Sequence, residues 1–262
     1  MTDKLEVMEV YPAWQGEGTR MGSASVFVRF ARCNLKCTWC DTKYAWSKEL
    51  LPHEHVDLLT PDELASRILE HVNFDDVVLT GGEPLLQHDG QLCALVDRLQ
   101  TANRHVTIET SGSLVPSKHL SHVDLWSYSP KLTSSGNWRS NKGRDAYWSK
   151  VVEGVTQMWD GPNVQLKFVI ADTDDVVDML DLCSRISEHT DAGIPPLMVQ
   201  PVGPNSTISG GHENVERTDL DDYSFKLQEL ETLVKEKVLP VFPSCRVLPQ
   251  LHKIIHSQAR LK

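Results

Sequence analysis

Three cysteines within eight residues are the feature of this sequence best suited to chemistry. Residues 33–42 read Cys-Asn-Leu-Lys-Cys-Thr-Trp-Cys-Asp-Thr, so Cys33, Cys37 and Cys40 follow the spacing C-x3-C-x2-C. Thiolates in one short loop can converge on a single centre, and iron–sulfur clusters are held by cysteine thiolates, usually four. Three ligands leave one iron without a protein ligand. By analogy with catalytic zinc sites, such an open position indicates reactivity.

A zinc site is the main alternative for this triad. Its fourth ligand would be His53, His55 or Asp41. Zinc motifs generally combine two C-x2–4-C pairs or add a downstream H-x3–5-H. In this chain His53 and His55 are only two residues apart, and no second cysteine pair follows. The spacing therefore favours an iron–sulfur cluster over zinc.

The elements that must position the triad alternate along the chain. Apolar runs predict strands at residues 7–11, 25–30, 76–80, 106–109, 125–129, 164–170 and 197–202. Apolar residues at helical spacing predict helices at about 60–71, 92–99, 174–189 and 219–237. Thr60, Pro61 and Glu63 supply a capping box and a first-turn proline for the first of these helices. The alternation predicts an α/β fold with a mainly parallel sheet. Because there are too few strands for a closed eight-stranded barrel, we expect an abbreviated, open (β/α) barrel.

Length and composition favour one ordinary domain. We expect a single domain over residues 1–262, because 262 residues with 40% hydrophobic side chains support one sizeable core. The segment Thr133–Asn163 is rich in Ser, Asn, Gly and Trp and reads as an insertion rather than core. Asn205–Arg217 reads as a polar loop. Of the remaining cysteines, Cys93 and Cys183 fall in helical apolar patterns, where a thiol acts as a small hydrophobe.

The net charge of −10 disfavours whole classes of partner. An acidic surface repels nucleic-acid phosphates, so we expect no direct nucleic-acid binding. No run approaches 18 consecutive apolar residues, and the first residues lack the apolar core of a signal peptide. We therefore expect a cytoplasmic protein that does not insert into a membrane.

Short polar motifs follow several of the predicted strands. Thr80-Gly81-Gly82-Glu83-Pro84, Glu109-Thr110-Ser111-Gly112 and Ser129-Pro130-Lys131 each stand at such a strand end. Each motif alone is also compatible with a simple turn. Polar residues at the carboxyl ends of barrel strands face the ligand-binding rim, and two glycines allow a backbone to approach a ligand closely.

The triad and the Gly-Gly-Glu-Pro turn together resemble the radical S-adenosylmethionine superfamily. Trp39, between the second and third cysteines, matches an aromatic position of that motif. The resemblance implies a 4Fe–4S cluster on the three cysteines and S-adenosyl-L-methionine bound to its unique iron. Glu83 would accept a hydrogen bond from the methionyl ammonium group. The residues that it implies for cofactor binding are Trp39, Cys40, Asp41, Gly82, Glu83, Ser129, Pro130, Lys131 and Gln200.

A narrower resemblance begins near the N-terminus. Gln15-Gly16-Glu17-Gly18, the strand Val26–Phe30, the triad, and the late Gln250-Leu251-His252-Lys253 resemble the 7-carboxy-7-deazaguanine synthase family. That family converts 6-carboxy-5,6,7,8-tetrahydropterin to 7-carboxy-7-deazaguanine with loss of ammonia, in the biosynthesis of queuosine and other 7-deazapurines. The substrate-binding residues that the resemblance implies are Trp14, Gln15, Gly16, Glu17, Arg29, Thr80 and His252.

Some roles implied by this resemblance also suit the side chains. The planar fork of Arg29 matches a substrate carboxylate bidentately, although a surface arginine on an edge strand is the alternative. Thr42 would be a protein ligand to Mg²⁺, which keeps several waters and binds few protein groups. His252 is a candidate for the same pocket, with a solvated surface histidine as its alternative. The resemblance further implies a homodimer and a flavodoxin-like or other reductant.

Two other functions are considered for the same motifs. One is a different radical enzyme, such as an activating enzyme for glycyl-radical proteins; some of those carry further cysteine clusters, and this sequence has none. The other is a non-enzymatic metal-binding or regulatory protein that keeps the fold. An intact triad beside an intact Gly-Gly-Glu-Pro motif favours retained chemistry.

Overall fold

The computed structural model describes residues 4–47, 56–159, 163–191, 193–203 and 219–256. The predicted loop Asn205–Arg217 and the candidate zinc ligands His53 and His55 lie outside the described residues. None of the helices in these ranges is both long and apolar enough to cross a membrane.

Nine described strands form one sheet in the order β3-β1-β2-β4-β5-β6-β7-β8-β9. They are β1 (Leu5–Trp14), β2 (Ala24–Phe30), β3 (Asp57–Leu59), β4 (Asp76–Gly81), β5 (His105–Thr110), β6 (Leu125–Tyr128), β7 (Val164–Ile170), β8 (Leu197–Pro201) and β9 (Arg246–Val247). β1 is antiparallel to both its neighbours, and all the other pairs are parallel. Because β3 and β9 end the sheet without pairing to each other, the barrel is open, as predicted.

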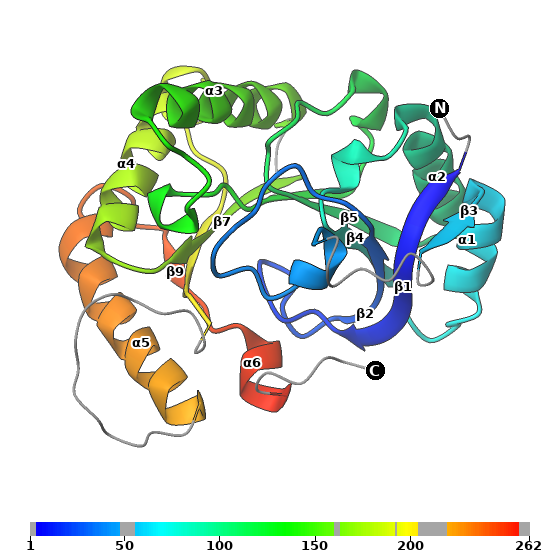
Figure 1. The fold of residues 1–262 in the computed structure, drawn as a ribbon, viewed down its shortest axis with the longest axis horizontal. Coiled ribbons are helices and arrows are strands. Elements are labelled where there is room, and N and C mark those ends of the chain that lie inside the picture. Colours follow the sequence, from blue (N-terminus) through cyan, green and yellow to red (C-terminus); the bar gives the residue numbers. More distant parts are fainter. Residues whose placement is uncertain (1–3, 48–55, 160–162, 192, 204–218, 257–262) are drawn as a thin grey trace.

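Five described helices cover the outer face of this curved sheet (Figure 1): α1 (Pro61–Leu69), α2 (Asp89–Thr101), α3 (Asn141–Met158), α4 (Thr173–Glu188) and α5 (Asp219–Leu233). The short α6 (Leu251–His256) lies instead at the opening of the barrel. The predicted capping box begins α1, because the Thr60 hydroxyl accepts from the Glu63 amide and the Glu63 carboxylate accepts from the Thr60 amide. The segment after β2 that carries the triad, residues 31–42, is called the cysteine loop; it crosses the opening of the barrel.

The structure differs from the expectation that residues 133–163 lie outside the core. Residues 141–158 form α3, whose Trp148, Val151 and Val155 are fully buried. Just before it, η5 (Thr133–Ser135) packs under the cysteine loop, where Ser135 accepts a hydrogen bond from the Thr38 amide at 2.9 Å. The Ser-, Gly- and Asn-rich start of the segment is typical of a loop and hid the helix that follows. That the segment is extra relative to other family members stays a prediction.

Strand β7 shows how the sheet builds both a core and a cavity. All seven of its residues are buried. Alternate side chains of a strand point to opposite faces, so Val164, Leu166 and Phe168 share one face. Gln165 and Lys167 share the other, and the Lys167 side chain lines the cavity described below. The polar side chains of β7, Gln165 and Lys167, therefore face the interior of the barrel.

Candidate active site

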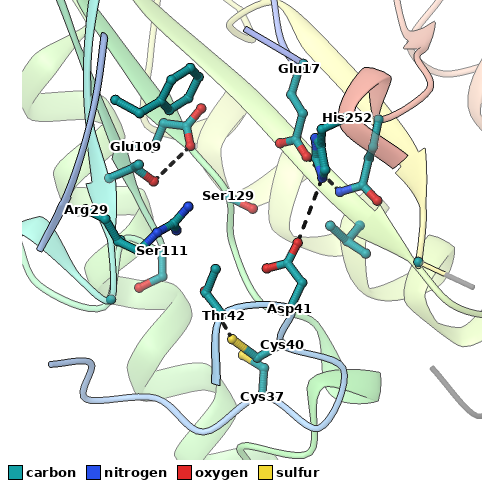
Figure 2. A pocket seen from close by; sticks show the side chains of 18 of the residues that line it. Glu17, Arg29, Cys37, Cys40, Asp41, Thr42, Glu109, Ser111, Ser129 and His252 are labelled. Atoms are coloured by element: carbon teal, nitrogen blue, oxygen red, sulfur yellow. Dashed lines mark hydrogen bonds and ion pairs between the residues drawn. The ribbon is translucent and has the colours of Figure 1, made fainter. Parts of the chain in front are cut away.

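A cavity of about 360 Å³ opens at the carboxyl ends of the parallel strands. Figure 2 shows the thiols of Cys37 and Cys40 at one end, with Glu17, Glu109 and His252 gathered toward the other. Of the residues predicted from the sequence as site residues, all but Glu83 and Pro130 line it. Segments separated by more than 200 residues, from β1 to α6, thus contribute to one site.

The three cysteines line the same end of the cavity. Burial raises the pKa of Cys33 to about 11 and also raises that of Cys37, while the nearby Lys131 ammonium opposes both shifts. In the part of the chain that the structure describes, the three sulfurs of the triad do not all lie within 4.8 Å of one another. Ligands of one tetrahedral zinc ion lie about 4 Å apart, given Zn–S bonds of ~2.3 Å. The wider spacing fits a multi-iron cluster better than a single zinc ion.

The Gly-Gly-Glu turn anchors the start of the cysteine loop. The Gly82 amide donates to the Phe30 carbonyl and the Glu83 amide donates to the Arg32 carbonyl, each at 2.9 Å. A Cβ atom on Gly82 would lie 1.8 Å from the Arg32 carbonyl oxygen. Only glycine permits this close approach of two backbone segments.

Glu83 lies beneath the cavity wall rather than in it. Its side chain is fully buried and accepts hydrogen bonds from the Thr110 hydroxyl at 2.7 Å and the Ser111 hydroxyl at 2.6 Å. It also accepts from the Ser111 and Leu85 amides. The structure thus gives Glu83 a part in joining β4 to β5, and its predicted contact with an ammonium group stays a prediction.

A buried charge network forms the opposite wall. Glu17 forms an ion pair with Lys167 and accepts a hydrogen bond from Nε2 of the Gln250 side chain at 2.7 Å. Burial alone would raise the pKa of Glu17, but the Lys167 ammonium and nearby His252 hold that pKa well below its usual range. Lys167 also lies 3.4 Å from Glu109, and the two carboxylates raise its pKa despite burial. Glu17 and Lys167 are therefore both charged at neutral pH.

Helix α6 joins the Gln-Gly-Glu-Gly segment to the cysteine loop. The Leu251 amide donates to the Gly16 carbonyl at 3.0 Å, and a Cβ atom on Gly16 would lie 2.8 Å from His252 Nδ1. On its other side, α6 presents His252 Nε2 at 3.9 Å and Lys253 Nζ at 3.3 Å from the Asp41 carboxylate (Figure 2). The surface alternative for His252 is wrong, because its ring lines the cavity between these two segments.

Arg29 lies in the cavity wall with its fork held in place. Its Nε donates to Glu9 at 2.8 Å, and its Nη2 donates to the Tyr11 hydroxyl at 2.7 Å. Only 14% of the side chain is exposed, so the alternative of a surface arginine is wrong. Tyr44 lies beside the guanidinium, 5.8 Å from its carbon to the ring centre. The surrounding aromatic rings and Glu9 fix the orientation that the guanidinium presents to the cavity.

Lys131 contacts both the cysteine loop and Ser129 of its own motif after β6. Its Nζ donates to the Ser129 hydroxyl at 3.0 Å and lies 5.5 Å from the centre of the Trp39 ring. Thr42, the predicted Mg²⁺ ligand, has its hydroxyl 3.6 Å from Cys40 Sγ. The remaining predicted residues that line the cavity are Trp14, Gln15, Asp41, Thr80, Gly82 and Gln200.

Several cavity residues were missed by the sequence analysis as site residues. They are Glu9, Tyr11, Lys167, Gln250 and Lys253, whereas Glu109 lies at the cavity as its strand-end motif led us to expect. For Lys167 a signal existed, because Gln165 and Lys167 interrupt an otherwise apolar strand at every second position. For Glu9 no local signal points inward, since it lies in a run of four partly buried residues of β1 without a regular alternation of buried and exposed positions.

Comparison with known proteins gives consistent matches. Residues 27–128 match the Radical SAM superfamily. The 7-carboxy-7-deazaguanine synthase of Halobacterium salinarum is 34% identical over 202 residues, covering 72% of this chain and 73% of the relative. The synthase of Methanopyrus kandleri is 29% identical and covers 97% of this chain and 94% of the relative. Among solved structures, QueE from Escherichia coli superposes with a TM-score of 0.62 at 21% identity, covering 96% of each chain.

Proposed function

Because this chain belongs to the 7-carboxy-7-deazaguanine synthase family of radical S-adenosylmethionine enzymes, we propose that it converts 6-carboxy-5,6,7,8-tetrahydropterin to 7-carboxy-7-deazaguanine, a lyase reaction of 7-deazapurine (queuosine-type) biosynthesis. One observation carries this proposal. The cysteine loop and the Gln15-Gly16-Glu17-Gly18 segment face each other across one cavity, although they come from different elements. A site for radical generation thus adjoins a polar site for the substrate.

The residues around the triad fit a 4Fe–4S cluster and S-adenosylmethionine. Three thiols converge with a spacing wider than one metal ion requires. When bound, the cluster and S-adenosylmethionine supply a 5′-deoxyadenosyl radical that removes a hydrogen atom from the substrate. Lys131 and Ser129 offer a cation and a hydroxyl for the methionyl carboxylate and ribose, and Gln200 adds a buried amide on the same rim.

The opposite wall is suited to the pterin. The edge of a pterin ring presents N–H donors, and the ionised Glu17 carboxylate accepts such hydrogen bonds strongly. Lys167 keeps Glu17 ionised by the ion pair described above. Arg29, fixed by Glu9 and Tyr11, presents a cation to the substrate carboxylate. The pterin ring is therefore held between Glu17, which accepts hydrogen bonds from its N–H groups, and Arg29, which binds its carboxylate.

Mg²⁺ is the third cofactor of the proposal. Thr42 comes two residues after the last cysteine and lines the cavity, so its hydroxyl would bind Mg²⁺ together with the substrate carboxylate and waters. We further propose a cytoplasmic homodimer that receives electrons from a flavodoxin-like or other reductant. Family membership supports all four features: Mg²⁺, the cytoplasmic location, the homodimer and the reductant.

The test is anaerobic reconstitution with iron and sulfide, followed by a mass-spectrometric assay for 7-carboxy-7-deazaguanine. The reaction contains 6-carboxytetrahydropterin, S-adenosylmethionine, Mg²⁺ and a reductant. Wild type and Cys245→Ala, whose thiol lies outside the cavity, should make product, and Cys37→Ala should make none. A cluster-loaded protein that cleaves S-adenosylmethionine without product would refute the substrate assignment. A colourless protein that holds zinc on the three cavity cysteines in place of the cluster would refute the whole proposal.

A further inference from the structure

Asn137 donates a hydrogen bond to one of the three cysteine sulfurs. Its Nδ2 lies 3.1 Å from Cys37 Sγ, and its Oδ1 accepts from the Lys36 amide at 2.7 Å. The contact with Lys36 determines the orientation of the amide, because a flipped side chain would place N–H against N–H. Nδ2 also contacts the Ser135 hydroxyl at 3.0 Å. Asn137 is thus held with a donor aimed at the sulfur.

The segment that carries Asn137 braces the cysteine loop along its length. Ser135 accepts from the Thr38 amide at 2.9 Å, and the Ser134 hydroxyl accepts from the Trp39 indole at 3.3 Å. The same Ser134 hydroxyl donates to Asp175 of α4 at 2.6 Å. The position of Asn137 relative to Cys37 is therefore set by a chain of contacts that reaches a core helix.

We propose that Asn137 is a positioning residue that raises the reduction potential of the cluster through its hydrogen bond to Cys37. Reduction adds negative charge that is shared by the cysteine sulfurs. An N–H donor stabilises the more negative state, and hydrogen bonds to sulfur are one of the determinants of cluster potential. This inference rests on the proposed function only in requiring the cluster, and not on the identity of the substrate.

The test is a redox titration of the cluster-loaded protein in the absence of pterin. Electron paramagnetic resonance monitors the reduced cluster during the titration. Asn137→Leu removes the donor at similar volume, so its midpoint potential should be more negative. At a fixed solution potential the ratio of reduced to oxidised cluster should fall at least threefold, equivalent to about 30 mV for one electron. Ser134→Ala is the matched control, because it loses a contact to the same loop without touching sulfur; its potential should match wild type.

A second variant covers the case in which Asn137→Leu does not hold a cluster. Asn137→Asp keeps the acceptor for the Lys36 amide and loses the N–H donor, so its potential should also be more negative. An unchanged potential in whichever variant carries a full cluster would overturn this inference and leave the proposed function standing. A shift of equal size in Ser134→Ala would also overturn it, because loop displacement would then explain the change. A wild-type protein unable to hold a cluster would refute both.

A separate group of ligands lies on the outer side of the barrel, away from the cavity. Cys93, Asp97 and His122 place their ligand atoms within 4.8 Å of one another, and none of them lines the cavity. Cys93 and Asp97 are four residues apart on α2 and so share a face. His122 lies in the turn before β6, which Gln100 of α2 holds by donating to the His122 carbonyl at 2.8 Å. Two elements thus present three different donors to one point.

We infer that Cys93, Asp97 and His122 form a Zn²⁺ site that ties α2 to the turn before β6. The donor set combines a thiolate, an imidazole and a carboxylate, which suits zinc and disfavours Mg²⁺. His122 Nε2 and Asp97 Oδ1 are already 2.9 Å apart, so small adjustments would complete the shell. Three protein ligands leave the fourth position of a tetrahedral zinc ion to water.

The test is a Zn²⁺ titration of the cluster-loaded protein against a chromogenic chelator. Cluster loading keeps the three cavity cysteines from binding zinc. Wild type and Cys245→Ser should bind one equivalent, whereas Cys93→Ser and His122→Gln should bind at least tenfold more weakly. Equal affinity in all four proteins, or no uptake by wild type, would overturn this inference. Neither result would bear on the proposed function.

Discussion

At the scale of single residues, the charge of the cavity depends on Lys167. Only 4% of its side chain is exposed, yet it pairs with Glu17 and lies 3.4 Å from Glu109. Two carboxylates share one ammonium, so this wall accepts hydrogen bonds and repels anions. The Arg29 side of the cavity has the complementary chemistry. The two walls would therefore favour one orientation of the proposed substrate, a ring with N–H donors and a carboxylate.

We predict that Lys167→Met destabilises the protein by about 3–5 kcal/mol, because removing one partner of a buried ion pair leaves uncompensated charge. Urea unfolding of the cluster-loaded protein measures this free energy. Lys150→Met, which removes an exposed lysine from α3, is the control and should change stability by less than about 0.5 kcal/mol. Equal stability of the two variants would contradict the role assigned to Lys167.

His252 gives the site a defined dependence on pH. Burial lowers the pKa of His252 from its usual 6.5, although Glu17 and Asp41 oppose the shift. The folded state therefore binds fewer protons at this residue than the unfolded state. By linkage, the contribution of the neutral His252 ring to the free energy of unfolding is complete above pH 6.5. It declines as the pH falls below that value.

We predict that His252→Gln makes the free energy of unfolding less dependent on pH between 7.5 and 5.5, taking about 6.5 as the pKa of an unfolded histidine. Denaturant unfolding at several pH values measures the slope for wild type and variant. His189→Gln, which changes an exposed histidine after α4, should keep the slope of wild type. A His252→Gln slope as steep as that of wild type would count against this assignment.

At the scale of elements, the turn after β4 determines where the cysteine loop begins. The backbones of Gly82 and Arg32 approach so closely that a Cβ atom at position 82 would overlap the Arg32 carbonyl. The two hydrogen bonds of this turn fix the start of the loop, and the contacts with residues 134–137 brace the rest of it. Cluster binding therefore depends on a backbone contact and not only on the three thiols.

We predict that Gly82→Ala forces this contact apart, destabilising the protein by about 1–3 kcal/mol, as overpacking typically does. It should also reduce the iron bound per chain after reconstitution. Gly90→Ala, near the start of α2, is the control, because its added Cβ meets only an ordinary contact at 3.5 Å. Iron content and unfolding free energy are the measurements. Full iron loading of Gly82→Ala would show that the turn does not position the loop.

At the scale of the whole molecule, residues 133–163 join the core to the site. Trp148 of α3 is fully buried, and Arg144 of the same helix stacks on its ring at 4.4 Å. Arg144 also pairs with Asp178 of α4, which accepts from the Thr133 amide in η5. The segment thus belongs to the continuous core and supports the cysteine loop from below.

We predict that Trp148→Ala destabilises the protein by about 3–5 kcal/mol, the usual effect of deleting a buried tryptophan. Trp14→Ala is the control, because the Trp14 side chain is 61% exposed at the cavity mouth; it should change stability by less than about 0.5 kcal/mol. Denaturant unfolding measures both. If Trp148→Ala were as stable as Trp14→Ala, the segment would be dispensable for the core.

The sequence alone determined the features that depend on local spacing. The three cysteines in one loop, the capping box at Thr60 and the alternation of strands and helices are all written in short stretches of chain. Such features follow from covalent geometry and periodicity, so they could be predicted from the residues themselves. The resemblances to the radical S-adenosylmethionine superfamily and to the synthase family supplied the cofactor- and substrate-binding residues, including His252.

Only the tertiary structure decided the contacts between distant segments. Lys167 meets Glu17 across 150 residues of sequence, and Asn137 meets Cys37 across 100. Glu83 has a motif that marks it for a ligand, yet packing places it beneath the wall. These outcomes depend on which side chains the sheet and helices bring together, and no local pattern encodes that choice. Spacing along the chain therefore predicted what chemistry is present, and long-range packing decided which groups support it.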